Sequence, residues 1–233
     1  MSNLGQRPSP PEFSGILRRN IVRVPEEVRR CSGIVVLGKR IKSLLFTTDV
    51  AIIRNHNADA VIAVYPFTPQ PAITHALMTA ADVPVFCGVG GGVTSGRRSV
   101  DIARDAEFHG ALGVVLNQPA PHDLVRRLKR VLEIPVIVTV ASLKDDVAGR
   151  VQAGADILNV SGARHTPEIV RGIRERFPTI PLLATGGREP DHIAAAIDAG
   201  ANAVTYTPPS SAELFRRIME RYRGEGTEGE AGP

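Results

Sequence analysis

The chain has 233 residues, of which 43% are hydrophobic and 22% are charged, and its formal net charge is +4. This length allows one large domain or two small ones, and the composition is that of an ordinary soluble globular protein. An aromatic content of 4% without tryptophan disfavours a single-strand nucleic-acid binder, because such proteins stack bases on aromatic side chains.

Membrane insertion and secretion are also disfavoured by the sequence. No apolar run reaches the roughly 20 residues that span a bilayer, and the N-terminus lacks the apolar segment of a signal peptide. Cys31 and Cys87 are too far apart to suggest a disulfide framework or a metal-ligand spacing. We therefore expect a cytoplasmic protein with no nucleic-acid or membrane partner.

The two ends of the chain are predicted to be disordered. Residues 1–12 are proline-rich with little apolar content, and residues 224–233 are rich in glycine and glutamate. Between them, residues 13–223 are expected to form a single domain. Its first segment, Phe13 to Arg30, is predicted to be a capping helix that closes the bottom of a barrel.

Strand-like apolar runs then alternate with helix-length segments. Eight runs start roughly every 21 to 27 residues. They are Ile34–Gly38, Ala60–Tyr65, Val85–Gly88, Leu112–Asn117, Val136–Val140, Ile157–Ser161, Leu182–Thr185 and Ala203–Thr207. Nearly unbroken Val, Ile, Leu and Ala runs are typical of parallel strands covered on both faces. Eight such units predict an α/β fold, the (β/α)8 TIM barrel. A doubly wound open sheet is the alternative, which the even spacing disfavours.

In a TIM barrel the functional site lies at the C-terminal ends of the strands, and the N-termini of the flanking helices favour an anionic ligand there. Polar side chains at these ends form a predicted substrate pocket. Its members are Tyr65, Asn117, Thr139, Asn159, Ser161 and Thr185. The alternative is a water-filled upper layer of the barrel that holds no ligand.

Charged groups are scarce at the same positions. No predicted strand ends on Asp or Glu, so paired carboxylates and metal ligands have no evident source, and we expect no metal. Lys39 follows the first predicted strand and is the one lysine placed for Schiff-base or proton-transfer chemistry. A surface position beside Arg40 and Lys42 is the alternative.

Two loops add further candidates. Gly88–Arg98 offers backbone N–H groups around Gly91 and the guanidinium of Arg97, which suit phosphate or carboxylate; a mobile lid is the alternative. The loop after the sixth predicted strand carries Arg164, which can take a second substrate charge, and His165. His165 can act as general acid or base near neutral pH, and a surface histidine beside a helix start is the alternative.

A Gly-Gly turn follows the seventh predicted strand. Gly186 and Gly187 can turn backbone N–H groups toward an anion, and Ser210 or Ser211 at the start of the last helix can complete the site. A tight strand-to-helix turn without a ligand is the alternative.

The run Ile180–Gly187 followed by Ala-Gly-Ala-Asn-Ala-Val resembles the last quarter of the phosphate-binding TIM barrels, which include the ribulose-phosphate-binding barrels. The resemblance implies phosphate at Gly186 and Gly187. It covers the barrel frame and half of a phosphate site, because no glycine follows the eighth strand. The Asp-x-Lys-x-x-Asp run of the decarboxylase branch and the strand-six lysine of the aldolase branch are also missing. FMN-dependent barrels share the Gly-Gly turn.

The sequence therefore predicts a metabolic enzyme, a lyase, isomerase or hydrolase, that acts on a small phosphorylated or carboxylated metabolite. His165 and Lys39 would move protons, and no cofactor is expected. The alternatives are an FMN-dependent oxidoreductase and a non-catalytic metabolite-binding barrel. A homodimer is expected because many barrels associate through their outer helices.

Overall fold

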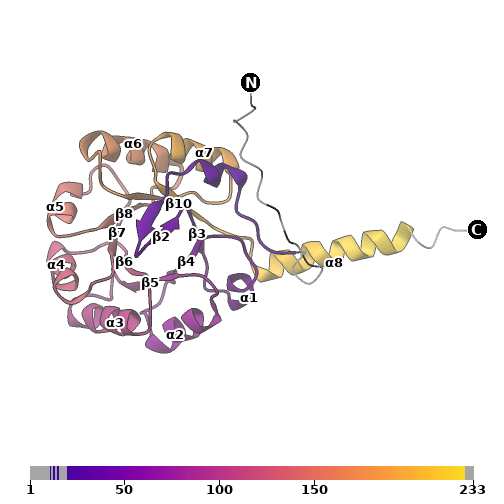
Figure 1. Ribbon diagram of the computed structural model, residues 1–233, viewed down its shortest axis with the longest axis horizontal. Helices are drawn as coiled ribbons and strands as arrows, with labels where there is room; N and C mark the ends of the chain where they lie inside the picture. Colours follow the sequence, from indigo (N-terminus) through magenta and orange to yellow (C-terminus); the bar gives the residue numbers. More distant parts are fainter. Residues whose placement is uncertain (1–10, 12, 14, 16–19, 229–233) are drawn as a thin grey trace, which may run out of the picture.

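The computed structural model describes residues 11, 13, 15 and 20–228, with side chains through residue 223 (Figure 1). Eight parallel strands close into a barrel in the order β10-β3-β4-β5-β6-β7-β8-β9. Helices surround this barrel, as Figure 1 shows. The predicted (β/α)8 TIM barrel is confirmed.

The barrel strands are short, and all except the first of them overlap the second to eighth predicted runs. They are β3 (Ser43–Phe46), β4 (Ala60–Ala63), β5 (Val85–Gly90), β6 (Gly113–Leu116), β7 (Val136–Val140), β8 (Ile157–Val160), β9 (Leu182–Thr185) and β10 (Ala203–Tyr206). The α-helices are α1 (Val50–Ile53), α2 (Pro71–Ala80), α3 (Gly96–Phe108), α4 (His122–Val131), α5 (Val147–Gln152), α6 (Thr166–Arg176), α7 (Pro190–Asp198) and α8 (Ser211–Glu228). A 3-10 turn, η3 (Ala163–His165), precedes α6.

Alternation along the strands divides the core into two layers. Ile62, Phe86 and Ile137 belong to the cluster inside the barrel, whereas Leu116 and Leu158 belong to the cluster between strands and helices. Each strand is therefore buried on both faces, which explains why the sequence shows apolar runs instead of alternation.

The first predicted strand is wrong. Ile34–Gly38 does not enter the barrel: β1 (Ile34–Val36) pairs antiparallel with β2 (Lys39–Ile41) in a separate hairpin. Leu37 and Gly38 form its two-residue turn, both with positive φ (46° and 81°), as type I′ hairpin turns require. The first barrel strand is β3, which was not predicted because its apolar run, Leu44–Phe46, is only three residues long.

The hairpin closes the bottom of the barrel. Val36 and Ile41 are buried in the inner cluster against residues at the starts of the strands, among them Ile157 and Ala203. A helix over Phe13–Arg30 was predicted for this role. Within it, the structure describes a 3-10 turn, η2 (Glu26–Arg30), and residues 20–25 are not helical; residues 14 and 16–19 lie outside the described part.

The C-terminal helix α8 projects away from the barrel (Figure 1). It extends to Glu228 and so includes residues 224–228 of the predicted tail. Residues 229–233, and residues 1–12 apart from Pro11, lie outside the described part. Among the described residues, no helix is both long and apolar enough to cross a membrane.

Candidate functional site

A cavity of about 280 Å³, the mouth cavity, opens where the barrel strands end. Ile62 and Val115 are its apolar lining deeper in the barrel. Its polar lining comes from five neighbouring strands and their ends: Asn117, Thr139, Asn159, Ser161, Thr185, Thr205 and Thr207. The structure thus brings together five of the predicted substrate-binding residues, because alternate positions of adjacent strands point to the barrel axis.

Hydrogen bonds join four of these side chains into a chain across four adjacent strands, from the end of β6 to β9. Thr185 Oγ1 donates to Asn159 Oδ1 (3.4 Å), Asn159 Nδ2 donates to Thr139 Oγ1 (3.3 Å), and Thr139 Oγ1 donates to Asn117 Oδ1 (3.1 Å). The chain ends on Asn117, whose Nδ2 has no partner among the described residues. This amide is therefore a donor available to a ligand.

Thr205 offers a second unused group. Its side chain is 1% exposed, and Oγ1 is buried without a hydrogen-bond partner, the one such side-chain atom among the described residues. A buried hydroxyl left unpaired costs about 1–3 kcal/mol, so native structures rarely keep one without a ligand or water. Thr205 lines the mouth cavity, which is where that partner would be.

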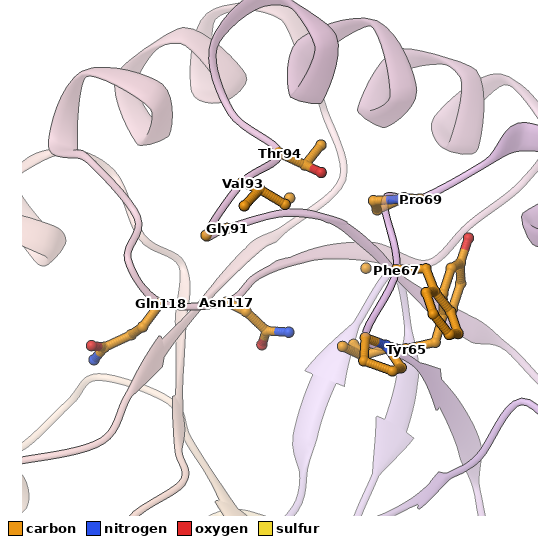
Figure 2. A pocket seen from close by; sticks show the side chains of 13 residues that line it. Tyr65, Phe67, Pro69, Gly91, Val93, Thr94, Asn117 and Gln118 are labelled. Carbon is orange, nitrogen blue, oxygen red and sulfur yellow. The ribbon is translucent and has the colours of Figure 1, made fainter.

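A second cavity, the side cavity, shares part of its lining with the first. It has a volume of about 250 Å³ and shares Val64 and Asn117 with the mouth cavity. Figure 2 shows Tyr65, Phe67 and Pro69 on one side and the loop with Gly91, Val93 and Thr94 across from them. The hydroxyl oxygen of Tyr65 accepts a hydrogen bond from Gln70 N (2.9 Å), which fixes the ring.

The glycine loop after β5 is pinned to its neighbours. Gly91 N donates to Thr94 O (2.8 Å), and Asn117 N donates to Gly90 O (2.9 Å). A Cβ on Gly91, whose φ is +113°, would lie 2.2 Å from Asn117 O. The loop is therefore a fixed wall beside Asn117 in which the Gly91 N–H is already used. Arg97 points away: its side chain is 92% exposed and its Nε is 3.5 Å from Asp101.

A buried charge network that the sequence did not reveal supports the rim between β6 and β7. Arg150, 7% exposed, donates to Thr139 O (2.6 Å) and lies 3.5 Å from Asp145. Burial alone would raise the pKa of Asp145. Hydrogen bonds from Ala141 N and the Gln118 amide, with the charge of Arg150, outweigh it and hold that pKa below its usual value. Gln118 consequently points away from Asn117, as Figure 2 shows.

His165 lies in η3, beside the mouth but not in its lining. Arg164 Nε donates to His165 Nε2 (3.1 Å), so in the neutral ring Nδ1 carries the proton and donates to Glu168 (3.0 Å). The side chain of His165 is 58% exposed. This places a histidine oriented by a carboxylate at the edge of the candidate site.

The predicted phosphate seat is already occupied by the chain's own acids. Ser210 N and Oγ donate to Glu213 Oε2 (2.7 and 2.9 Å), which also accepts from Arg188, and Ser211 Oγ donates to Asp49. Hydrogen bonds from Ser210 N–H, Arg188 and the Ser210 hydroxyl lower the pKa of Glu213 to about 2. The two serines are therefore not free to take a phosphate as expected.

The Gly-Gly turn itself is tight. Gly186 N donates to Thr205 O (3.0 Å), and a Cβ on Gly186 would lie 2.7 Å from Ile193. Gly187, with φ +67°, has open space around it. Gly186 thus connects β9 to β10 and α7, and of the pair only Gly187 leaves its N–H unused within the described structure.

Lys39 is not at the mouth. It lies on β2, in the hairpin at the opposite end of the barrel, and is exposed. The expectation that it lies at the C-terminal end of a barrel strand is wrong, because Ile34–Gly38 turns back before reaching the barrel. Lys39 and His165 therefore cannot act in one site.

Solved structures share this fold at low sequence identity. No protein-family profile and no curated protein matches the chain. A candidate phosphonomutase from Burkholderia cenocepacia J2315 is 15% identical with a TM-score of 0.59, and the match covers 87% of this chain and 95% of the phosphonomutase. A 2,3-dimethylmalate lyase of the PEP mutase/isocitrate lyase superfamily is 14% identical with a TM-score of 0.57, and the match covers 93% of this chain and 88% of the lyase. A phosphonopyruvate hydrolase, solved in complex with oxalate and Mg²⁺, is 12% identical with a TM-score of 0.59, and the match covers 86% of this chain and 87% of the hydrolase.

These neighbours correct two expectations. They are a candidate phosphonomutase, a lyase and a phosphonopyruvate hydrolase and not ribulose-phosphate-binding barrels, and at this identity they confirm only the TIM-barrel part of the resemblance. The expectation of no cofactor, with FMN as the alternative, is contradicted by the phosphonopyruvate hydrolase that was solved with Mg²⁺, and FMN is not supported.

The donor set of this chain nevertheless differs from a protein-made Mg²⁺ site. Mg²⁺ is usually held by one or two carboxylates with substrate oxygens and water. The lining of the mouth cavity contains hydroxyls and amides but no carboxylate. Asp49 and Glu213 are engaged with the serines at the start of α8. The residues present therefore do not fit a Mg²⁺ site, and the similarity to these structures shows a shared TIM-barrel fold.

Proposed function

We propose that the chain is a lyase, isomerase or hydrolase that acts on a small carboxylated metabolite in the mouth cavity. The observation that carries the proposal is the pair of unused groups at the two ends of the polar lining, Asn117 Nδ2 and Thr205 Oγ1. Enzymes of similar fold include a lyase and a phosphonopyruvate hydrolase, which supports this class of reaction.

A carboxylate suits the mouth better than a phosphate suits the Gly-Gly turn. Asn117 and Thr205 can each donate a hydrogen bond to a carboxylate oxygen. The N-termini of the surrounding helices add partial positive charge at this face. At the Gly-Gly turn, by contrast, Glu213 already takes the donors of Ser210 and Arg188.

Two groups near the site can transfer protons. His165 has the orientation of a general base, since Glu168 fixes its tautomer, but Arg164 must leave Nε2 for it to act. Tyr65 is the titratable side chain among the lining residues of the two cavities, and its hydroxyl proton is not used by the Gln70 contact. Both belong to this proposal, and Lys39 does not.

The test is a thermal-shift screen of the full chain against pyruvate, oxalate, malonate, longer 2-keto acids and inorganic phosphate. Compounds that raise the melting temperature are then incubated with the protein, and turnover is followed by proton NMR. His165→Ala and Tyr65→Phe are assayed beside Lys39→Ala, a matched loss of a polar group at the other end of the barrel.

The proposal predicts stabilisation by carboxylates and turnover that falls in His165→Ala or Tyr65→Phe but not in Lys39→Ala. Stabilisation without turnover of any compound would instead indicate a binding barrel. Stabilisation by phosphate alone would indicate that the ligand site is the Gly-Gly turn and not the mouth cavity. No stabilisation by any compound would refute the site.

A further inference from the structure

A histidine and aspartate cluster lies on the outside of the barrel, away from the candidate site. His75 of α2 and Asp105 of α3 meet with His75 Nε2 2.8 Å from Asp105 Oδ2. The ring of His109, at the end of α3, stacks on that of His75 with 3.6 Å between centroids and 29° between planes. One nitrogen or oxygen from each of the three side chains lies within 4.8 Å of the other two.

We propose that His75, Asp105 and His109 bind a divalent transition-metal ion of the Zn²⁺ class, with water as the fourth ligand. Two imidazoles and one carboxylate match the ligands that Zn²⁺ takes in tetrahedral sites with an open position. Mg²⁺ and Ca²⁺ prefer oxygen ligands, so two histidines argue against them. The three side chains are 33%, 30% and 47% exposed, which gives an ion access from solvent.

The local fold presents the three groups together. Asp105 and His109 are four residues apart on α3 and therefore share a face of the helix, while His75 reaches them from the adjacent α2. His109 Nδ1 lies 2.8 Å from the Asp105 carbonyl and 3.6 Å from Asp105 Oδ1. When Nδ1 donates to the carbonyl, the lone pair of Nε2 remains for a metal.

Binding requires a small rearrangement. For Nε2 of a neutral His75 to ligate the metal, the proton that it shares with Asp105 moves to Nδ1, so the ring stays neutral and Nε2 offers a lone pair. The two stacked rings must separate by rotation about their side-chain bonds, for which their partial exposure leaves room. The carboxylate of Asp105 stays beside both histidines, as it is now.

The position of this cluster connects it to the side cavity. Helix α2 follows the Tyr65–Gln70 wall, and α3 follows the glycine loop that forms the opposite wall. A metal ion that joins α2 to α3 would hold these two walls at a fixed separation. The metal site does not depend on the proposed function.

The experiment uses the untagged, metal-free full chain titrated with Zn²⁺ by calorimetry, with Co²⁺ absorption spectra as a report of tetrahedral coordination. The variants are His75→Gln, His109→Gln and Asp105→Asn. His122→Gln is the matched control, because His122 pairs with Asp146 (3.7 Å) on another outer face, where the described residues supply no third ligand. Circular dichroism verifies that each variant is folded. If a histidine variant does not fold, Asp105→Asn still tests whether the cluster binds the metal.

We expect one Zn²⁺ per chain. Each ligand variant should weaken binding by at least the roughly 10- to 100-fold that loss of an outer-shell partner typically costs, and His122→Gln should bind as the parent does. Absence of stoichiometric Zn²⁺ binding to the parent would overturn the proposal. Binding that is equal in the parent and all three ligand variants would overturn it as well.

Discussion

Replacement of Gly91 by alanine should destabilise the barrel and displace the ligand-facing amide of Asn117. At φ +113° a non-glycine residue is strained by about 1–3 kcal/mol. The added Cβ would also lie 2.2 Å from Asn117 O and 2.5 Å from Asn117 C, both backbone atoms. To reach ordinary contact, the loop and the end of β6 would have to separate by about 1 Å.

That separation breaks the contact that positions Asn117. The hydrogen bond from Asn117 N to Gly90 O (2.9 Å) would be lost or lengthened, which costs about 0.5–1.5 kcal/mol in addition to the strain. We therefore expect Gly91→Ala to lower the free energy of unfolding by about 3 kcal/mol. For a domain of this size, each kcal/mol corresponds to about 2–4 °C in melting temperature.

Gly92→Ala is the matched control. Gly92 also has positive φ (+62°), but the nearest atom to an added Cβ is Gln118 O at 4.0 Å, so we expect only the left-handed backbone cost of about 1–2 kcal/mol. Urea unfolding of the two variants and the parent measures the difference. If Gly91→Ala costs no more than Gly92→Ala, the close approach to Asn117 does not constrain the loop, and the reasoning is wrong.

Three further predictions concern single side chains. Thr205→Val removes a hydroxyl without a protein partner, so urea unfolding should show unchanged stability or a gain of up to about 1 kcal/mol, while a large loss would mean that the hydroxyl has a partner. The pKa of Glu213 is lowered from 4.5 to about 2 in the folded chain, so the stabilisation that its carboxylate gives is present above pH 4.5 and is lost as the pH falls toward 2. The difference in unfolding free energy between the parent and Glu213→Gln should therefore shrink between pH 4.5 and pH 2, and a constant difference would contradict this prediction. Lys39→Ala should leave ligand affinity unchanged in calorimetry, because Lys39 lies at the other end of the barrel.

Much of the barrel follows from the sequence because parallel strands buried on both faces leave apolar runs. The exception is instructive: Ile34–Gly38 has the same composition as a barrel strand, and only the Leu37–Gly38 turn sends it into a hairpin. Glycine at the second turn position was a signal, but Leu37 at positive φ is unusual. The polar ring of the mouth was predictable because alternation fixes which strand residues face the axis.

Other parts of the site depend on contacts between distant residues. The Arg150–Asp145 pair and the unpaired hydroxyl of Thr205 could not be read from spacing, since both result from how separate strands and loops pack. The use of Ser210 was different. Ser210 and Glu213 form a capping box at the start of α8, and the Ser-x-x-Glu pattern was visible in the sequence. That pattern favours a helix cap over a phosphate seat.

Calorimetric titration of the stabilising carboxylate into Asn159→Asp tests the central claim most directly. Asn159 is 7% exposed and lies in the middle of the hydrogen-bond chain, so an added negative charge there should repel a bound carboxylate. Asn55→Asp adds the same charge at the exposed opposite end of the barrel and is the control. The account predicts lost binding in Asn159→Asp and parental binding in Asn55→Asp. Parental affinity in a folded Asn159→Asp would show that the carboxylate does not bind in the mouth cavity.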